Sequence, residues 1–246
     1  MFPIRDHNPS LRRPYVTFGL IGLNLAIHLL VILSIPNERA LGQLYYQFGM
    51  IPARLSDGQE YLTLISGTFL HAGWLHLAGN MLFLWIFGDN LEDRLGHVRF
   101  GLFYLAGGIG AGLVQWAAAP LSGVPTIGAS GAIAGIMGGY LLLYPKARVD
   151  VLIIFIVFFK IFPIPAWIVL GVWFGLQLFS GIGDAASAGG VAYWEHIGGF
   201  VVGLGLILPV WLRAGGIASW TATHGQPPHP EARYSPSRIP VVPRRR

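Results

Sequence analysis

The chain has 246 residues, of which 54% are hydrophobic and 11% charged, and its formal net charge is +5. Soluble domains carry about 25% charged residues, so this composition excludes an ordinary soluble enzyme, a disordered chain and, despite the basic balance, a nucleic-acid-binding module. The absence of cysteine excludes disulfides, thiolate metal sites and a cysteine nucleophile. The apolar residues gather in runs of about 20, the length that crosses the hydrocarbon core of a bilayer. We therefore predict a multi-span membrane protein.

Six apolar runs predict an all-α membrane protein with six transmembrane helices. In chain order the runs are Tyr15–Ile35, His76–Leu91, Phe100–Ala119, Thr126–Tyr144, Ile164–Gly181 and Trp194–Leu212. Between the first two runs lies a long polar segment, which we expect to stay outside the membrane. Its amphipathic parts, Leu41–Met50 and Tyr61–Leu70, are suited to the membrane interface.

The stretch Val149–Ile182 is ambiguous, because Lys160 and two prolines interrupt it. It reads either as two short spans or as one span, Ile164–Gly181, preceded by an interfacial segment. A crossing helix needs about 17–25 residues, and the part before the prolines is shorter than that. We therefore favour the single span.

The positive charges predict the orientation. With six spans both ends of the chain lie on one side, and that side collects all Lys and Arg residues except Arg39 and Arg54. Because short cytoplasmic loops are enriched in Lys and Arg, we expect both termini in the cytoplasm, with the chain in a bacterial inner (cell) membrane. The expected organisation is a cytoplasmic segment (1–14), a six-span domain (15–213) and a disordered Pro- and Arg-rich cytoplasmic tail (214–246).

Four polar residues stand at the starts of apolar runs, where polar groups are costly and usually functional. Ser130 begins the fourth run and His196 the sixth, while His76 and Asn80 lie four residues apart on one face of the second. All even-numbered spans begin on the non-cytoplasmic side, so the four residues arrive at a similar depth. Two crossings within the ambiguous stretch would instead move His196 to the opposite face.

A serine and a histidine are the minimum for nucleophilic acyl transfer, since the imidazole takes the hydroxyl proton and the oxygen attacks a carbonyl. Hydrogen-bond donors must then meet the developing oxyanion. Ser130 follows Gly128 and opens a helix, so its backbone N–H has no helical partner. We expect further donors from the side chains of His76 and Asn80.

Glycine spacing explains how the serine and the histidine meet. Gly131 and Gly135 on the fourth run, and Gly199 and Gly203 on the sixth, are each four residues apart. Such small-residue faces allow close approach of helices in lipid. His196 precedes Gly199 by three residues and therefore lies on the same face.

These blocks resemble the rhomboid family of intramembrane serine proteases. The resemblance covers roughly residues 15–212 and rests on three blocks, Gly128-Ala129-Ser130-Gly131, His196-Ile197-Gly198-Gly199-Phe200 and His76-Leu77-Ala78-Gly79-Asn80. It implies a six-helix bundle with a long first extramembrane loop. It also implies a Ser130–His196 dyad without a carboxylate third member, and an oxyanion site made by His76, Asn80 and the Ser130 amide.

The resemblance further implies a structural ion pair between Glu92 and Arg94 at the cytoplasmic end. Two positions depart from the family's pattern. Ala134 stands where some members place a tyrosine against the catalytic histidine, so the sequence assigns no residue to support the His196 ring. Glu195 stands where relatives often have a small residue, and we do not assign it as a triad acid, because adjacent helical residues point in different directions.

The predicted function is an intramembrane serine endopeptidase that cleaves peptide bonds in or near transmembrane segments. Its expected partners are transmembrane protein substrates and the lipid bilayer, with no nucleic acid, and the oligomeric state stays open. No HExxH pattern occurs, so we expect neither a metal nor another cofactor. A catalytically inactive rhomboid-like protein that binds membrane proteins is the alternative, followed by a channel or transporter.

Overall fold

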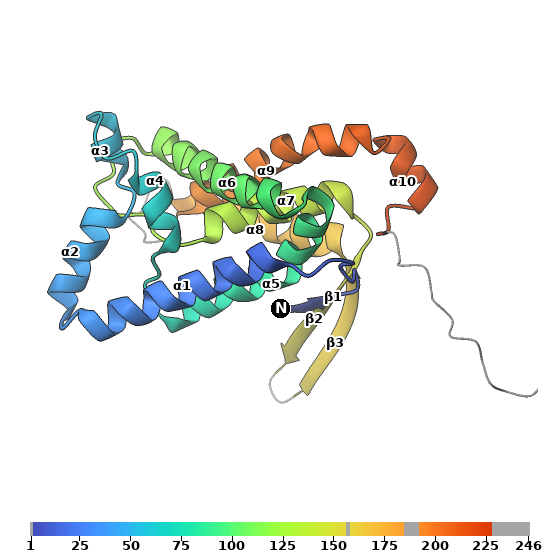
Figure 1. Ribbon diagram of the computed structural model, residues 1–246, viewed down its shortest axis with the longest axis horizontal. Helices are drawn as coiled ribbons and strands as arrows, with labels where there is room; N and C mark the ends of the chain where they lie inside the picture. Colours follow the sequence, from blue (N-terminus) through green and yellow to red (C-terminus); the bar gives the residue numbers. More distant parts are fainter. Residues whose placement is uncertain (1, 156–157, 185–191, 228–246) are drawn as a thin grey trace, which may run out of the picture.

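The computed structural model describes residues 2–155, 158–184 and 192–227, which form a helical bundle with a small sheet at one end (Figure 1). The α-helices are α1 (Tyr15–Ser34), α2 (Glu38–Phe48), α3 (Pro52–Ser56), α4 (Thr63–Ser66), α5 (Trp74–Leu95), α6 (His97–Ala118), α7 (Ser130–Leu143), α8 (Ala166–Asp184), α9 (Tyr193–Arg213) and α10 (Ile217–Thr223). The 3₁₀ helix is η1 (Gly67–Phe69), and the strands are β1 (Phe2–Asp6), β2 (Arg148–Phe155) and β3 (Phe158–Pro165).

A helix covers most of each of the six predicted runs. Helices α1, α6, α8 and α9 are long and apolar enough to cross a membrane. The short α4–η1 segment and α5, bent by 99° from each other, together meet the same test. Helix α7 is apolar but has only 14 residues. The chain is therefore a mostly helical integral membrane protein.

Helix α7 is the centre of the bundle, in contact with α5, α6, α8 and α9. Every residue from Gly131 to Tyr140 is buried, and the run contains four glycines and two alanines. Such small residues let neighbouring backbones approach closely in lipid, where packing replaces the hydrophobic effect as the main attraction between helices. The short α7 is thus enclosed by longer helices, which places its first residue inside the bundle.

The expectation of an all-α fold is wrong at one end of the molecule, where three antiparallel strands form a sheet in the order β1-β2-β3. The register pairs Asp6 with Val149, and Arg148 with Pro165. The stretch before Ile164, expected to be interfacial, is thus a hairpin that pairs with the N-terminal strand. Its β-branched residues suit a strand whose alternate side chains enter the core, as Val149 and Val151 do.

Ionic contacts hold the N-terminal strand in place. Asp150 of β2 is buried and accepts hydrogen bonds from Arg5 Nη2 at 2.7 Å and from His7 Nε2 at 2.8 Å. Burial opposes ionisation of Asp150, but these two partners hold the pKa of its carboxyl below the usual value. On the other side of the strand, Tyr140 Oη donates to Asp6 Oδ2 at 2.7 Å. The N-terminal segment is therefore tied to both the sheet and α7.

Glu92, near the end of α5, has other partners than the expected Arg94. Its carboxylate accepts hydrogen bonds from the backbone N–H groups of Val16 and Thr17 at 2.8 and 2.7 Å, and it lies 2.5 Å from His97 Nδ1. The first N–H groups of a helix lack intrahelical acceptors, so the carboxylate caps α1. Arg94 is exposed and forms no ion pair with Glu92 among the described residues, and the expected pair is wrong.

The segment between α1 and α5 folds into α2, α3, α4 and η1 at the end of the bundle opposite the sheet (Figure 1). Met50, Leu55 and Leu64 form a second small core with Ile109 and Trp116 of α6. Helix α10 lies within the stretch expected to be a disordered tail, so that expectation is wrong for 217–223. The rest of the predicted tail, 228–246, lies outside the described residues.

Candidate active site

Ser130 is the first residue of α7 and follows a loop that two backbone contacts hold. Met50 and Thr126 form a β-bridge, and the Gly128 N–H donates to the carbonyl of Gly67 at 3.0 Å. Gly128 has φ +131°, a conformation that L side chains rarely adopt. A Cβ there would also lie 2.8 Å from His76 Nε2. Glycine is therefore required at 128 to bring the loop into α7 beside the histidine.

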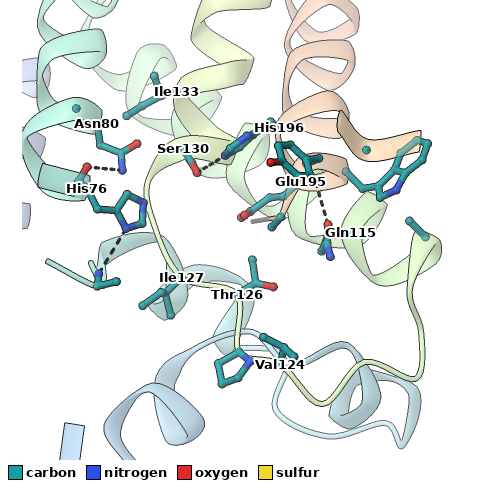
Figure 2. Close-up of a pocket in the computed structure, with 18 of the residues that line it drawn as sticks. His76, Asn80, Gln115, Val124, Thr126, Ile127, Ser130, Ile133, Glu195 and His196 are labelled. Atoms are coloured by element: carbon teal, nitrogen blue, oxygen red, sulfur yellow. Dashed lines mark hydrogen bonds between the residues drawn. The ribbon is translucent and has the colours of Figure 1, made fainter. Parts of the chain in front are cut away.

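Ser130 and His196 form a hydrogen bond, with Ser130 Oγ 2.8 Å from His196 Nε2 (Figure 2). His196 is in the first turn of α9, so two helix N-termini meet at this point. The helix pair can approach because of its glycines. A Cβ at Gly199 would overlap the Gly131 carbonyl oxygen, and a Cβ at Gly203 would overlap that of Gly135. The structure thus brings together both residues of the predicted dyad and four of the five glycines predicted to pack near it, while the fifth, Gly128, lies in the loop before α7 against His76.

Two residues of α8 support the His196 ring, and sequence reasoning missed both. Gln177 Oε1 lies 2.8 Å from His196 Nδ1. The ring of Trp173 is tilted by 39° against the imidazole, with 5.9 Å between the centroids. Gln177 and Trp173 thus support the His196 ring, a role for which the sequence offered no residue because position 134 is Ala134. The available signal was Gln177 itself, because an amide within an apolar run needs a polar partner.

The Gln177 contact determines the tautomer of His196. A carbonyl oxygen can only accept, so Nδ1 carries the proton. In the neutral ring Nε2 is then an acceptor, and it accepts from the Ser130 hydroxyl. This is the arrangement in which a histidine can remove the serine proton.

His76 presents a donor to the same place. The Ala72 N–H donates to His76 Nδ1 at 3.4 Å, a long hydrogen bond, so Nε2 carries the proton of the neutral ring. The position of a Cβ at Gly128 would be 2.8 Å from His76 Nε2 and 3.6 Å from Ser130 Oγ. The histidine N–H and the serine hydroxyl therefore face one small volume. Asn80, 7% exposed, donates from Nδ2 to the His76 carbonyl at 3.1 Å and lines the same region (Figure 2).

The polar residues open onto a cavity of 780 Å³. All four residues singled out in the sequence line it, and so do Trp173 and Glu195. Figure 2 shows the segment with Val124, Thr126 and Ile127 passing along the cavity beside Ser130. Within the described ranges no three His, Asp or Glu side chains are grouped as metal ligands. The site is thus a hydrogen-bonded serine–histidine pair in a cavity within an apolar bundle.

Comparison with known proteins found relatives of one family. Residues 58–213 match the model of the Rhomboid domain. The chain is 32% identical to the rhomboid protease GluP of Bacillus subtilis over 193 residues, which cover 78% of this chain and 35% of that protein. It is 35% identical to the chloroplastic Rhomboid-like protein 11 of Arabidopsis thaliana over 133 residues, which cover 54% of this chain and 43% of that protein.

A third relative is the mitochondrial Rhomboid protein 1 of Saccharomyces cerevisiae, 27% identical over 199 residues. That alignment covers 77% of this chain and 51% of the relative. The chain therefore spans about half or less of the length of these relatives. Because the domain model matches well over half of the chain, and the match includes both residues of the hydrogen-bonded pair, the chain belongs to the rhomboid family.

Proposed function

We propose that this protein is an intramembrane serine endopeptidase that cleaves peptide bonds in or near transmembrane segments, with Ser130 as nucleophile and His196 as general base. The observation that carries the proposal is the 2.8 Å contact between Ser130 Oγ and His196 Nε2 inside a membrane bundle. A structural serine in a membrane helix needs no histidine acceptor, and it needs no cavity large enough for a peptide.

In the proposed reaction, His196 Nε2 takes the Ser130 hydroxyl proton while the oxygen attacks the carbonyl carbon of the substrate. Gln177, bonded to Nδ1–H, keeps the ring in the required tautomer and orientation. The tetrahedral oxyanion accepts hydrogen bonds from His76 Nε2–H, the Ser130 N–H and Asn80. The protonated His196 then gives its proton to the leaving amine, and an acyl-enzyme remains.

The acyl-enzyme is then hydrolysed, with a water molecule in the place that the leaving amine occupied. His196 removes a proton from a water molecule, the hydroxide attacks the acyl carbonyl, and the ester bond to Ser130 breaks. The proton on His196 returns to the serine oxygen. The polar residues of the 780 Å³ cavity supply hydrogen-bond partners for such water.

We further propose that α1, α5, α6, α7, α8 and α9 are six crossing helices, and that the stretch between α1 and α5 is the long first loop. Arg39 and Arg54 belong to α2 and α3, at the end of the bundle opposite the sheet (Figure 1). The remaining positive charges of the described chain belong to the other end, as the positive-inside rule requires for cytoplasmic termini. The dyad then opens toward the non-cytoplasmic side, with the bacterial inner membrane as the proposed location.

The substrate is proposed to be a single transmembrane helix that partly unwinds. A helix in lipid hides its peptide bonds in internal hydrogen bonds, so attack by Ser130 requires local opening of the helix. Glycine or other small residues near the cleaved bond lower the cost of that opening. Substrates with such residues near the outer end of the span are expected to be cleaved fastest.

The test combines active-site labelling and cleavage. Purified protein is treated with a fluorophosphonate probe and, separately, with a reporter-tagged single-span substrate in lipid vesicles. Wild type is expected to react in both assays, and Ser130→Ala and His196→Ala in neither. Ser180→Ala, on α8 outside the cavity lining, is the matched control and is expected to behave as wild type. Unchanged cleavage by both dyad variants would refute the proposal, and binding of substrates without any turnover would favour the inactive alternative.

A further inference from the structure

Glu195 is a buried acidic residue that the proposed reaction does not use. It is the third residue of α9 and is 8% exposed. Figure 2 shows it near His196 and Gln115, among the residues that line the cavity. A Cβ at Gly131 would lie 3.0 Å from Glu195 Oε1. The carboxylate therefore lies against the residue that directly follows the nucleophile.

The Glu195 carboxylate has no ion-pair partner among the described side chains. Its backbone N–H donates to Gln115 Oε1 at 3.1 Å, and among the described residues no side chain forms an ion pair with the carboxylate oxygens. Burying an acidic group without a partner is costly. The first turn of α9 reduces that cost, because the N-terminal end of a helix favours negative charge. The protein thus maintains an acidic group at the wall of its substrate cavity.

The Glu195 carboxyl differs in charge from the other residues that line the cavity. Among the lining residues that the structure describes, Glu195 is the sole acid, and none is Lys or Arg. Tyr193 and Trp194, which precede Glu195 in α9, also line the cavity. An aliphatic stem can pack along such apolar walls while its charged end reaches a carboxylate, as Lys and Arg side chains do in other proteins.

We propose that Glu195 forms a substrate subsite that selects a basic side chain, Lys or Arg, close to the cleaved bond. The inference rests on the proposed peptidase function and adds the class of substrate. A basic side chain would supply the missing partner of Glu195, whereas an apolar one would leave the carboxylate buried and unpaired. Sites built to pair with a substrate group discriminate strongly against analogues that lack it.

Such a subsite would be selective among membrane proteins. In the proposed orientation the cavity opens to the non-cytoplasmic side, and Lys and Arg are enriched on the opposite side of transmembrane segments. A basic residue at the outer end of a span is therefore uncommon. An enzyme that requires one would ignore most spans and cleave a small subset.

The test uses matched single-span substrates reconstituted with the full-length enzyme in phosphatidylcholine vesicles. The cleaved bond is first mapped on one reporter substrate by mass spectrometry. A single Arg is then placed at each of the four positions on either side of that bond, and a second series carries Met at the same positions. The readout is the ratio of the Arg rate to the Met rate at each position, because this ratio cancels differences in the amount of folded enzyme.

For wild type the ratio is expected to reach about tenfold or more at one position, the size expected for a hydrogen bond to a charged group. In Glu195→Gln, which keeps the shape but removes the charge, the ratio is expected to fall toward one at that position. Glu38→Gln, the same chemical change on the exposed face of α2, is expected to keep the wild-type ratio.

Two results would overturn the inference. A wild-type ratio near one at all positions would show that no basic subsite exists, and an equal ratio in wild type and Glu195→Gln would place the selectivity elsewhere. In both cases cleavage itself would still support the peptidase. Failure of wild type to cleave any substrate of either series would instead overturn the proposed function, and this inference with it.

Discussion

Gly199→Ala offers a direct test of the packing between α7 and α9, because it adds one methyl group where the two helices touch. A Cβ at Gly199 would overlap the Gly131 carbonyl oxygen and lie 2.9 Å from its carbonyl carbon. Gly131 directly follows Ser130, and Gly199 is one helical turn after His196. The added methyl group therefore separates the helices beside the dyad.

The size of the effect follows from contact distances. Non-bonded heavy atoms pack at about 3.5–4.0 Å, so relief of the overlap requires a displacement on the order of 1 Å. The Ser130–His196 contact would then lengthen from 2.8 Å beyond the normal limit of a hydrogen bond. A misplacement of about 1 Å in an active site costs about 10²-fold in rate, and overpacking of a core costs about 1–3 kcal/mol in stability.

The assay measures cleavage of a reporter-tagged single-span substrate and fluorophosphonate labelling, with the thermal unfolding midpoint recorded in the same detergent. Gly205→Ala is the matched control, since it makes the same change on the same helix at a position with no atom within 4 Å. We expect Gly199→Ala to lose about 10²-fold in cleavage rate and to unfold at a lower temperature. Gly205→Ala is expected to keep the wild-type rate and midpoint.

The reasoning would be refuted if Gly199→Ala cleaved and unfolded like Gly205→Ala. That result would mean that α9 accommodates the methyl group without moving His196. A lower midpoint with an unchanged rate would also contradict the reasoning, because the overlap would then be relieved away from the dyad.

Three further predictions concern single side chains. Gln177→Met removes the acceptor for His196 Nδ1 and should lower cleavage about 10–100-fold, as loss of an orienting partner does elsewhere; Gln177→Glu restores an acceptor and should recover most of the rate, and equal rates for the two variants would contradict the orienting role. His76→Ala removes one oxyanion donor and should lower kcat about 10²–10³-fold while labelled substrate still binds; an unchanged kcat would contradict that role. Burial raises the pKa of Asp6 from 3.8 to about 7, so the folded protein keeps a proton that the unfolded chain has lost; its contribution to stability should be complete below about pH 4 and disappear as pH rises through 7. Asp6→Asn should remove this part of the pH dependence of the unfolding midpoint, and identical pH profiles for variant and wild type would refute it.

The helices could be predicted from the sequence because their signal is local. A run of about 20 apolar residues has to be helical in lipid to satisfy its own backbone, and each of the six runs contains a helix, although α7 has only 14 residues. The sheet could not be predicted in the same way. A short apolar stretch such as Val149–Phe155 reads equally as helix or strand, and its pairing with the first residues of the chain is a contact across about 140 residues.

For the candidate site, the sequence by itself identified the polar residues that line the cavity and the helix faces that meet, because an ionisable group in an apolar run stands out and glycine spacing indicates which faces pack together. Only the tertiary structure decided what surrounds the dyad. Gln177 and Trp173 reach His196 because of how α8 is rotated against α9, and Glu92 caps α1 instead of pairing with Arg94. Both outcomes depend on helix rotation and packing between segments far apart in the chain, and no local pattern encodes them.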